Sequence, residues 1–288
     1  MTWKVRSNLW LLSISRHWMR GVLVFWLIFG GLPWAAPVLM ELGATGPASV
    51  IYRMYTPMCH RFPFRSFFLF GEQGAYPLAA AETGYKPFEA YAGVSHIPQE
   101  MRAYRLPQPP FAVRTLPEFA AAYPRTSRDA ASESATVPIE IPADLARSDP
   151  VNFARVQLVS STFVGNELMG YKTAVCERDL SIYIGLGLSA AIFAIPAVRR
   201  KLRPLPIWLY LFIGLGPIGL DGVSQLLSYA PFQWWPARET TPVFRVMTGL
   251  IFGLATGWLG YPNIELSMQD TRRAIEAKLR AAGFLRES

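Results

Sequence analysis

A charged, cysteine-bearing segment runs directly into a long apolar one in the stretch Val175-Cys176-Glu177-Arg178-Asp179-Leu180-Ser181-Ile182-Tyr183-Ile184-Gly185. On a single helix, Cys176, Asp179 and Tyr183 would share one face, because side chains three, four and seven positions apart lie above one another. The apolar residues continue to Val198, close to the length of about 20 residues that crosses a bilayer. The stretch therefore predicts a membrane-spanning helix with a polar site at one end.

Composition extends this interpretation to the whole chain. The 288 residues are 51% hydrophobic and only 17% charged, and the apolar residues are clustered. Four segments are dominated by apolar residues and approach the length that spans a bilayer core of about 30 Å. They are 21–43, 174–198, 205–230 and 246–264. We predict an all-α integral membrane protein with about four transmembrane helices.

The net charge of +8 comes from basic residues beside these segments: Lys4, Arg6, Arg16, Arg20, Arg199, Arg200, Lys201, Arg203, Arg272, Arg273, Lys278, Arg280 and Arg286. The positive-inside rule places them in the cytoplasm. We therefore expect a multi-pass protein of the plasma membrane with both termini inside. Residues 1–20 form a cytoplasmic or interfacial segment, and residues 265–288 form an amphipathic tail. The position of the basic residues then indicates membrane topology and contact with the lipid bilayer, and it does not indicate a nucleic-acid partner.

Residues 44–173 are extracytoplasmic in this topology. Between Gly71 and Gly165 the composition changes to Pro, Ala and Tyr with scattered charges, and no repeat or sustained period is present. We expect a long Pro/Ala-rich insert between helices 1 and 2.

Both cysteines of the chain fall in parts that are predicted to be extracytoplasmic, where disulfides persist. A Cys59–Cys176 disulfide is one interpretation. The other includes the neighbours His60 and Asp179, because Cys, His, Cys and Asp are four acceptable ligands for a tetrahedral zinc ion. The sequence leaves the disulfide and the metal site open.

Asp221 interrupts the third apolar segment and begins a polar stripe with Ser224 and Gln225 at helical spacing. It follows Arg203 by about 27 Å of helix, at about 1.5 Å per residue, which places it near the outer edge of the hydrocarbon. A carboxylate at that depth needs a partner, and Arg178, Arg65 and Arg61 are the available cations. A structural ion pair and a direct role in a site both fit.

Three motifs occur in order: Cys59-His60 with Pro63 and Arg65-Ser66-Phe67, Cys176-Glu177-Arg178 with Ile182-Tyr183-Ile184-Gly185, and Asp221-Gly222-Val223-Ser224-Gln225. In this order they resemble the motifs of a family of prokaryotic integral membrane proteins that is known only as a domain of unknown function. Two positions depart from the family pattern. Arg61 stands where Gln is common, and Asp179 stands where many relatives have a second Cys. The resemblance implies a shared site but names no reaction.

Together the motifs predict one polar site at the extracytoplasmic surface, and the leading hypothesis is a zinc site. The metal ligands would be Cys59, His60, Cys176 and Asp179, and the surrounding residues would be Arg65, Arg178, Tyr183, Asp221 and Gln225. Arg178 would pair with Asp221. The substrate would be lipid-borne or extracytoplasmic, and no catalytic residue is assigned.

A second hypothesis is a non-catalytic accessory subunit of a larger membrane complex, with the disulfide and the ion pair as scaffolding. An open cavity over these residues would favour the first hypothesis, and a dry, fully paired cluster beside a flat apolar flank would favour the second. A transporter ranks third, because four helices with one polar notch offer no inverted repeat.

Overall fold

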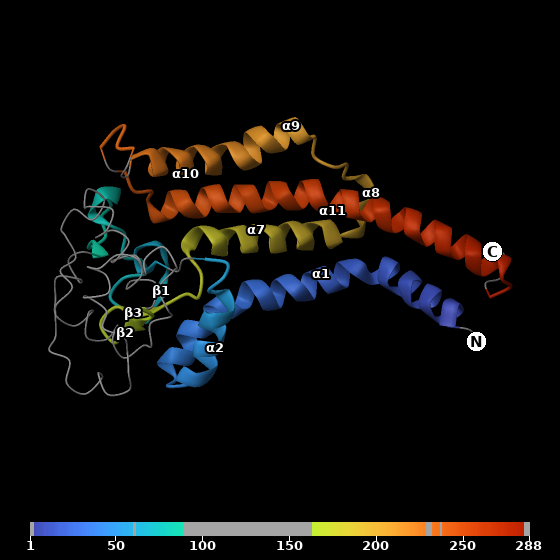
Figure 1. Cartoon of the computed structure of the whole chain (residues 1–288), viewed down its shortest axis with the longest axis horizontal. Coiled ribbons are helices and arrows are strands. Elements are labelled where there is room, and N and C mark those ends of the chain that lie inside the picture. Colours follow the sequence, from blue (N-terminus) through green and yellow to red (C-terminus); the bar gives the residue numbers. More distant parts are fainter. Residues whose placement is uncertain (1–2, 60–61, 89–162, 229–231, 237, 285–288) are drawn as a thin grey trace, which may run out of the picture. The chain divides into compact units, whose positions relative to one another are not determined.

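The computed structural model describes residues 3–59, 62–88, 163–228, 232–236 and 238–284. Its elements are α1 (Trp3–Glu41), α2 (Thr45–Tyr55), η1 (Pro63–Arg65), β1 (Phe68–Leu69), η2 (Ala79–Ala81), β2 (Gly165–Asn166), β3 (Gly170–Lys172), α7 (Glu177–Ala194), α8 (Pro196–Lys201), α9 (Ile207–Leu209), η4 (Tyr210–Leu215), α10 (Gly216–Ser228) and α11 (Pro242–Ala281) (Figure 1). The chain divides into two compact units. The helical unit comprises Met1–Gly31, Ser181–Ile218 and Met247–Ser288, and the site unit comprises Leu32–Leu180 and Gly219–Val246.

Three helical segments of the described ranges are long and apolar enough to cross a membrane: Val5–Glu41, Ile207–Ser228 and Pro242–Ala281. The other expected span corresponds to α7, whose 18 residues begin with the charged side chains Glu177, Arg178 and Asp179. The helix ends at Ala194 because Pro196 starts the separate helix α8. The apolar part of α7 is therefore shorter than the roughly 20 residues that cross a bilayer.

Helix α1 is continuous from Trp3 to Glu41, whereas the sequence predicted an interfacial segment before a span at 21–43. Pro37 lies inside this helix and has no N–H group, so the carbonyl of Pro33 loses its usual helical partner. The backbone N–H of Ala174 donates to that carbonyl over 3.1 Å. This hydrogen bond satisfies the carbonyl, so the helix can continue past Pro37.

The later helices also differ from their expected bounds. The predicted span 205–230 consists of α9, the π-helical turn η4 and α10. The predicted span 246–264 and much of the expected tail 265–288 form one 40-residue helix, α11. Pro262 lies inside this helix without ending it, which is tolerated in apolar helices whose neighbours satisfy the freed carbonyl.

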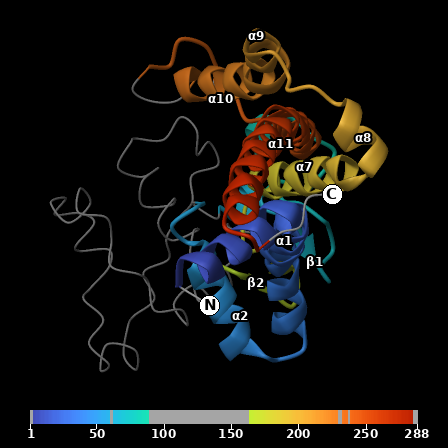
Figure 2. The ribbon, with the colours of Figure 1, turned by 90° about the vertical axis from the view of Figure 1, so that its right-hand side faces the viewer.

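Close contact between α7 and α11 organises the helical unit, and the two helices run next to each other in Figure 1 and in the rotated view of Figure 2. A Cβ atom on Gly185 would lie 2.7 Å from the carbonyl oxygen of Leu250, and one on Gly253 would lie 2.4 Å from that of Ile182. Neither position has room for a larger residue. Glycine at both positions therefore lets the two backbones approach directly.

The core of the helical unit is an aromatic cluster formed by Trp18, Met19, Ala190, Phe193 and Tyr261. A buried carboxylate, Glu265, lies beside this cluster. It accepts hydrogen bonds from Trp18 Nε1 at 2.8 Å, Arg199 Nε at 2.9 Å and Arg272 Nη2 at 2.5 Å. Part of the basic charge that flanks the apolar segments therefore has a structural partner within this unit.

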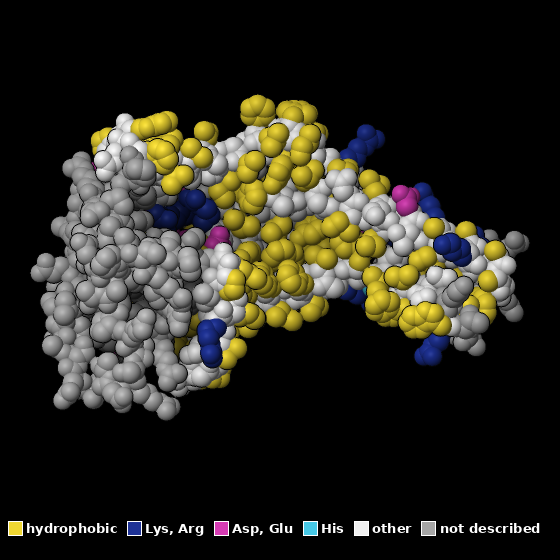
Figure 3. Space-filling view, viewed as in Figure 1, with side chains coloured by type: hydrophobic (Ala, Val, Ile, Leu, Met, Phe, Trp, Pro, Cys, Tyr) yellow, Lys and Arg dark blue, Asp and Glu magenta, His cyan; other side chains and the backbone are white. Residues whose placement is uncertain are grey.

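Many large apolar side chains of the helical unit face outward. Leu27 on α1 is 77% exposed, Phe212 on η4 is 76% exposed, and Trp208 on α9 is 60% exposed. Figure 3 shows hydrophobic side chains gathered over the helices on the face that it presents. Soluble monomers rarely expose such contiguous apolar surface, so this surface fits contact with lipid.

The site unit contains a small antiparallel sheet with strand order β1-β3-β2. Phe68 of β1 pairs with Lys172 of β3, and the N–H of Thr173 donates to the carbonyl of Phe67 over 2.8 Å. The fold is therefore mostly helical, not purely helical as expected from the sequence. Strands of two or three residues are too short to show an alternating pattern. Only the two ends of the predicted insert lie within the described residues.

Candidate functional site

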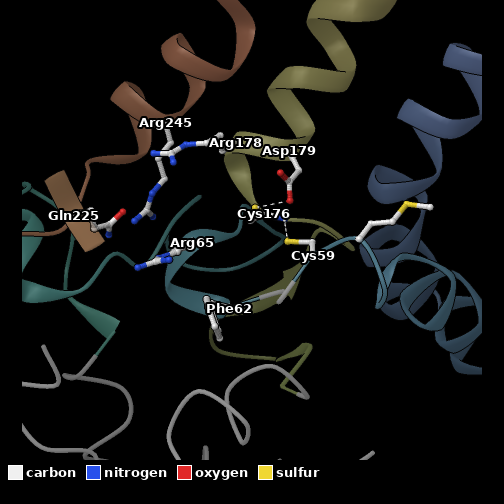
Figure 4. A pocket seen from close by; sticks show the side chains of 9 residues that line it. Cys59, Phe62, Arg65, Cys176, Arg178, Asp179, Gln225 and Arg245 are labelled. Atoms are coloured by element: carbon white, nitrogen blue, oxygen red, sulfur yellow. Dashed lines mark hydrogen bonds between the residues drawn. The ribbon is translucent and has the colours of Figure 1, made fainter. Parts of the chain in front are cut away.

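The β1–β3 pairing brings together the two segments that carry the cysteines. Cys59 follows α2 and is separated from β1 by the short helix η1, while Cys176 follows β3 and directly precedes α7. The backbone N–H of Cys176 donates to the sulfur of Cys59 over 3.3 Å. Figure 4 shows the two side chains next to each other. The two cysteines are therefore close enough to belong to one site.

A compact group of metal-ligand atoms surrounds this contact. The thiol of Cys176 donates to Asp179 Oδ2 over 2.9 Å, which follows from their spacing across one turn at the start of α7. The ligand atoms of Cys59, Cys176 and Asp179 all lie within 4.8 Å of one another. The two cysteines are not joined by a disulfide in this structure. The remaining predicted ligand, His60, lies outside the described residues.

The Cys176 thiol is held in its neutral form by its surroundings. Its hydrogen bond with Cys59, its burial and the charge of Asp179 together raise the pKa of Cys176 well above its usual value. A thiol that is neutral at neutral pH is a weak nucleophile, because the thiolate is the reactive form. A cation bound beside the sulfur would reverse this preference, since metals bind the thiolate.

Asp221 is the centre of a buried polar network. It forms an ion pair with Arg178, and Arg238 Nη2 donates to Asp221 Oδ1 over 3.0 Å. The hydroxyl of Thr240 donates to the same carboxylate at 2.9 Å. Arg238 is fixed in turn by the hydroxyl of Ser224, which its Nη1 reaches at 2.7 Å. The polar stripe on α10 therefore faces protein partners, which neutralise the charge of Asp221.

A second network is centred on Glu239, whose side chain is fully buried. Arg65 makes a two-pronged contact with it, through Nε to Oε1 at 2.9 Å and Nη2 to Oε2 at 3.1 Å. Arg245 forms an ion pair with the same carboxylate. Arg245 Nη1 also lies 3.6 Å from Glu177 Oε2. One buried carboxylate therefore fixes two arginines from separate elements, η1 and α11.

A cavity of about 260 Å³ opens between these groups. Its lining consists of Met58, Cys59, Phe62, Arg65, Cys176, Arg178, Asp179, Gln225 and Arg245. The thiols and Asp179 lie to one side of it and the arginines and Gln225 to the other (Figure 4). The carboxylates of Asp221 and Glu239 are not part of the lining. The cavity is therefore bordered by ligand atoms for a cation on one side and by guanidinium groups on the other.

Comparison with known proteins gives a family match for part of the chain. Residues 161–259 match the family model of DUF2085, described as a predicted membrane protein. This match confirms the expected relationship to an uncharacterised membrane family. No curated protein and no solved structure gives a match.

The DUF2085 region supplies most of the charged residues of the site. Asp179, Asp221, Glu239 and Arg245 lie inside it. Cys59, with the motif around it, lies outside the matched range. The two halves of the thiol pair therefore come from different parts of the chain, and only the part with Cys176 lies within the DUF2085 region.

The sequence also predicted Gln225 and Tyr183 beside the metal ligands, and these two residues lie in different units. Gln225 lines the cavity. Tyr183 belongs to the helical unit, where its ring packs against Phe29 with 5.0 Å between the ring centroids and against Trp26 at 6.1 Å. In that unit Tyr183 is part of an aromatic cluster with α1.

Sequence reasoning missed four residues that follow the Asp221 motif: Arg238, Glu239, Thr240 and Arg245. A signal was present, because Arg238-Glu239-Thr240 places opposite charges and a hydroxyl in the short link between two apolar segments. The predicted fourth span begins at residue 246, one position after Arg245. The structure includes it in α11, where Glu239 neutralises its charge.

Proposed function

We propose that this membrane protein holds a zinc-like metal ion with Cys59, Cys176 and Asp179. The observation that carries the proposal is the separation of at most 4.8 Å among the three ligand atoms, which come from two segments far apart in the sequence. The adjoining cavity supports a working site more than a sealed structural one, because it leaves room beside the ligands. A lipid-borne or extracytoplasmic substrate would bind in this cavity.

The donor set fits zinc by its chemistry. Two thiolates and one carboxylate are among the ligands that zinc accepts, and three protein ligands leave a fourth position for water or substrate in catalytic sites. His60 is the residue that would close the site with a fourth protein ligand. The arginine networks would stabilise the segments on which the ligands lie, in the manner of outer-shell contacts.

The proposal includes a location for the site. The basic residues beside the apolar segments favour a plasma-membrane protein with both termini in the cytoplasm and the site at the extracytoplasmic end. A tag accessibility assay tests this arrangement. Protease added to intact cells should leave a terminal tag uncut, and digestion of the tag would contradict the proposed topology.

Metal analysis and thiol titration test the site itself. The full chain is purified in detergent without chelator, and the metal content and the number of reactive thiols after denaturation are measured together. We expect about one zinc ion per chain and two free thiols, with the metal lost in Cys176→Ser and in Asp179→Asn. The matched control is Glu72→Gln, which removes an exposed carboxylate of the same unit. Absence of metal with no reactive thiols would contradict the proposal.

The second candidate is a non-catalytic accessory subunit of a larger membrane complex. The buried ion pairs of Asp221 and Glu239 favour it, because they join η1, α7, α10 and α11 without any ligand. In this case Cys59 and Cys176 would form a disulfide that locks the same arrangement. The thiol titration separates the two candidates, and co-purification of a stoichiometric membrane protein would support the accessory role.

A further inference from the structure

We infer that the cavity binds a phosphate-type anion on its arginine side. Three guanidinium groups line it, from Arg65, Arg178 and Arg245, together with the amide of Gln225. They belong to η1, α7, α11 and α10, so the tertiary structure alone gathers them. Guanidinium groups are the preferred protein partners of phosphate and carboxylate, because their fixed fork of donors matches paired oxygens. This anion site deepens the proposed function by giving a substrate class, but it requires no metal.

The arginines are fixed before any ligand arrives. The carboxylates of Asp221 and Glu239 are fully buried behind the cavity, whereas the side chains of Arg178 and Arg65 are 20% and 24% exposed. Each carboxylate therefore orients an arginine that is also part of the cavity lining. Preorganised groups of this kind bind at a lower entropic cost, since their rotamers are already selected.

The charge of the lining and the volume of the cavity limit the class of ligand that can bind. The lining carries three arginines and one carboxylate, Asp179, whose oxygen accepts from the Cys176 thiol. An anion is therefore favoured on the arginine side. Part of each guanidinium already donates to a buried carboxylate, Arg65 and Arg245 to Glu239 and Arg178 to Asp221. A phosphate has more oxygens than a carboxylate, so it can reach several of these partly engaged groups at once. The volume of about 260 Å³ is below the range of about 300–1,000 Å³ for drug-sized ligands. A free phosphate or the phosphate head group of a lipid would fit.

The strength of the site depends on arrangement, not on net charge. Four arginines and four carboxylates line the cavity or pair with residues that line it. The arginines are Arg65, Arg178, Arg238 and Arg245, and the carboxylates are those of Glu177, Asp179, Asp221 and Glu239. These charges balance in number. Selectivity for oxyanions over chloride at equal ionic strength should therefore come from the hydrogen-bond geometry of the guanidinium groups, and binding should weaken as salt screens the interaction.

The test measures the thermal unfolding midpoint of the full detergent-solubilised chain, treated with chelator so that no metal contributes. One arm adds inorganic phosphate against sodium chloride at constant ionic strength. The other adds dihexanoyl phosphatidic acid against dihexanoyl phosphatidylcholine in the same micelles. A ligand that binds only the folded state raises the midpoint, and the rise gives its affinity. A response to phosphate indicates a soluble ligand, and a response to the lipid alone indicates a head group.

The variants connect the response to the cavity. Arg65→Gln should weaken binding by about tenfold or more, the scale of one charge-assisted hydrogen bond. The control Arg53→Gln removes an exposed arginine of the same unit outside the cavity and should bind like the wild type. If Arg65→Gln does not fold, Arg65→Lys keeps the charge without the fork and should show an intermediate loss.

Two results would overturn the anion site: no stabilisation beyond the matched control in either arm, or equal stabilisation of Arg65→Gln and Arg53→Gln. The metal proposal fails separately. Phosphate binding by wild-type protein that contains no zinc after purification without chelator would leave the anion site standing and remove the metal centre.

Discussion

The backbone N–H of Cys176 donates a hydrogen bond to the sulfur of Cys59, 117 residues away in the sequence. Asp179 adds its carboxylate to the same group through the thiol of Cys176. The contact places two soft donors and one hard donor together at the start of α7. The identity of the third donor should therefore determine how strongly a soft metal is preferred.

Replacing Asp179 with cysteine should strengthen zinc binding. The substitution provides a third thiolate and gives the Cys-x-x-Cys spacing common in the family that the motifs resemble. We expect an affinity about tenfold higher, because thiolates suit zinc better than a carboxylate does. Competition with a chromophoric chelator under reducing conditions measures it. An affinity equal to that of the wild type would show that residue 179 does not contact the metal.

Removing the charge of Asp221 should destabilise the protein. Asp221→Asn leaves Arg178 and Arg238 without their shared carboxylate, and loss of one partner of a buried pair costs about 3 kcal/mol. The expected result is a lower midpoint in thermal or denaturant unfolding. Asp270→Asn is the control, because that carboxylate is 77% exposed and its ion pair should contribute less than about 1 kcal/mol. Equal stability of the two variants would contradict a structural role for Asp221.

Two glycines of α11 should respond in opposite ways to the same substitution. Gly253→Ala places a Cβ atom 2.4 Å from the carbonyl oxygen of Ile182, so we expect a loss of about 1–3 kcal/mol from overpacking. Gly260→Ala meets no atom within 4 Å and should be neutral or up to about 1 kcal/mol stabilising, because alanine favours the helix. Unfolding midpoints in the same detergent measure both. If both variants behave alike, α7 and α11 do not pack as closely as described.

The sequence by itself determined the class of protein and much of the candidate site. The long apolar segments predicted membrane-spanning helices, because hydrophobic length is a local property that the bilayer selects. The cysteines, Asp179 and Asp221 were found as motifs, since ionisable residues beside apolar runs are unusual. The bounds were less accurate, because α1 and α11 continue through their prolines, and in α1 the N–H of Ala174 from elsewhere in the fold satisfies the carbonyl of Pro33.

Only the tertiary structure decided which charges meet. The partners of Glu239 are Arg65 and Arg245, one far away in the sequence and one that lies at the edge of an apolar run. No periodicity encodes such pairing, because a buried carboxylate is stabilised by whichever cations the packing brings within a few ångströms. The β1–β3 contact that aligns the two cysteines is equally non-local, and its strands are too short for a pattern to reveal. The cavity exists because these long-range contacts hold four elements around it.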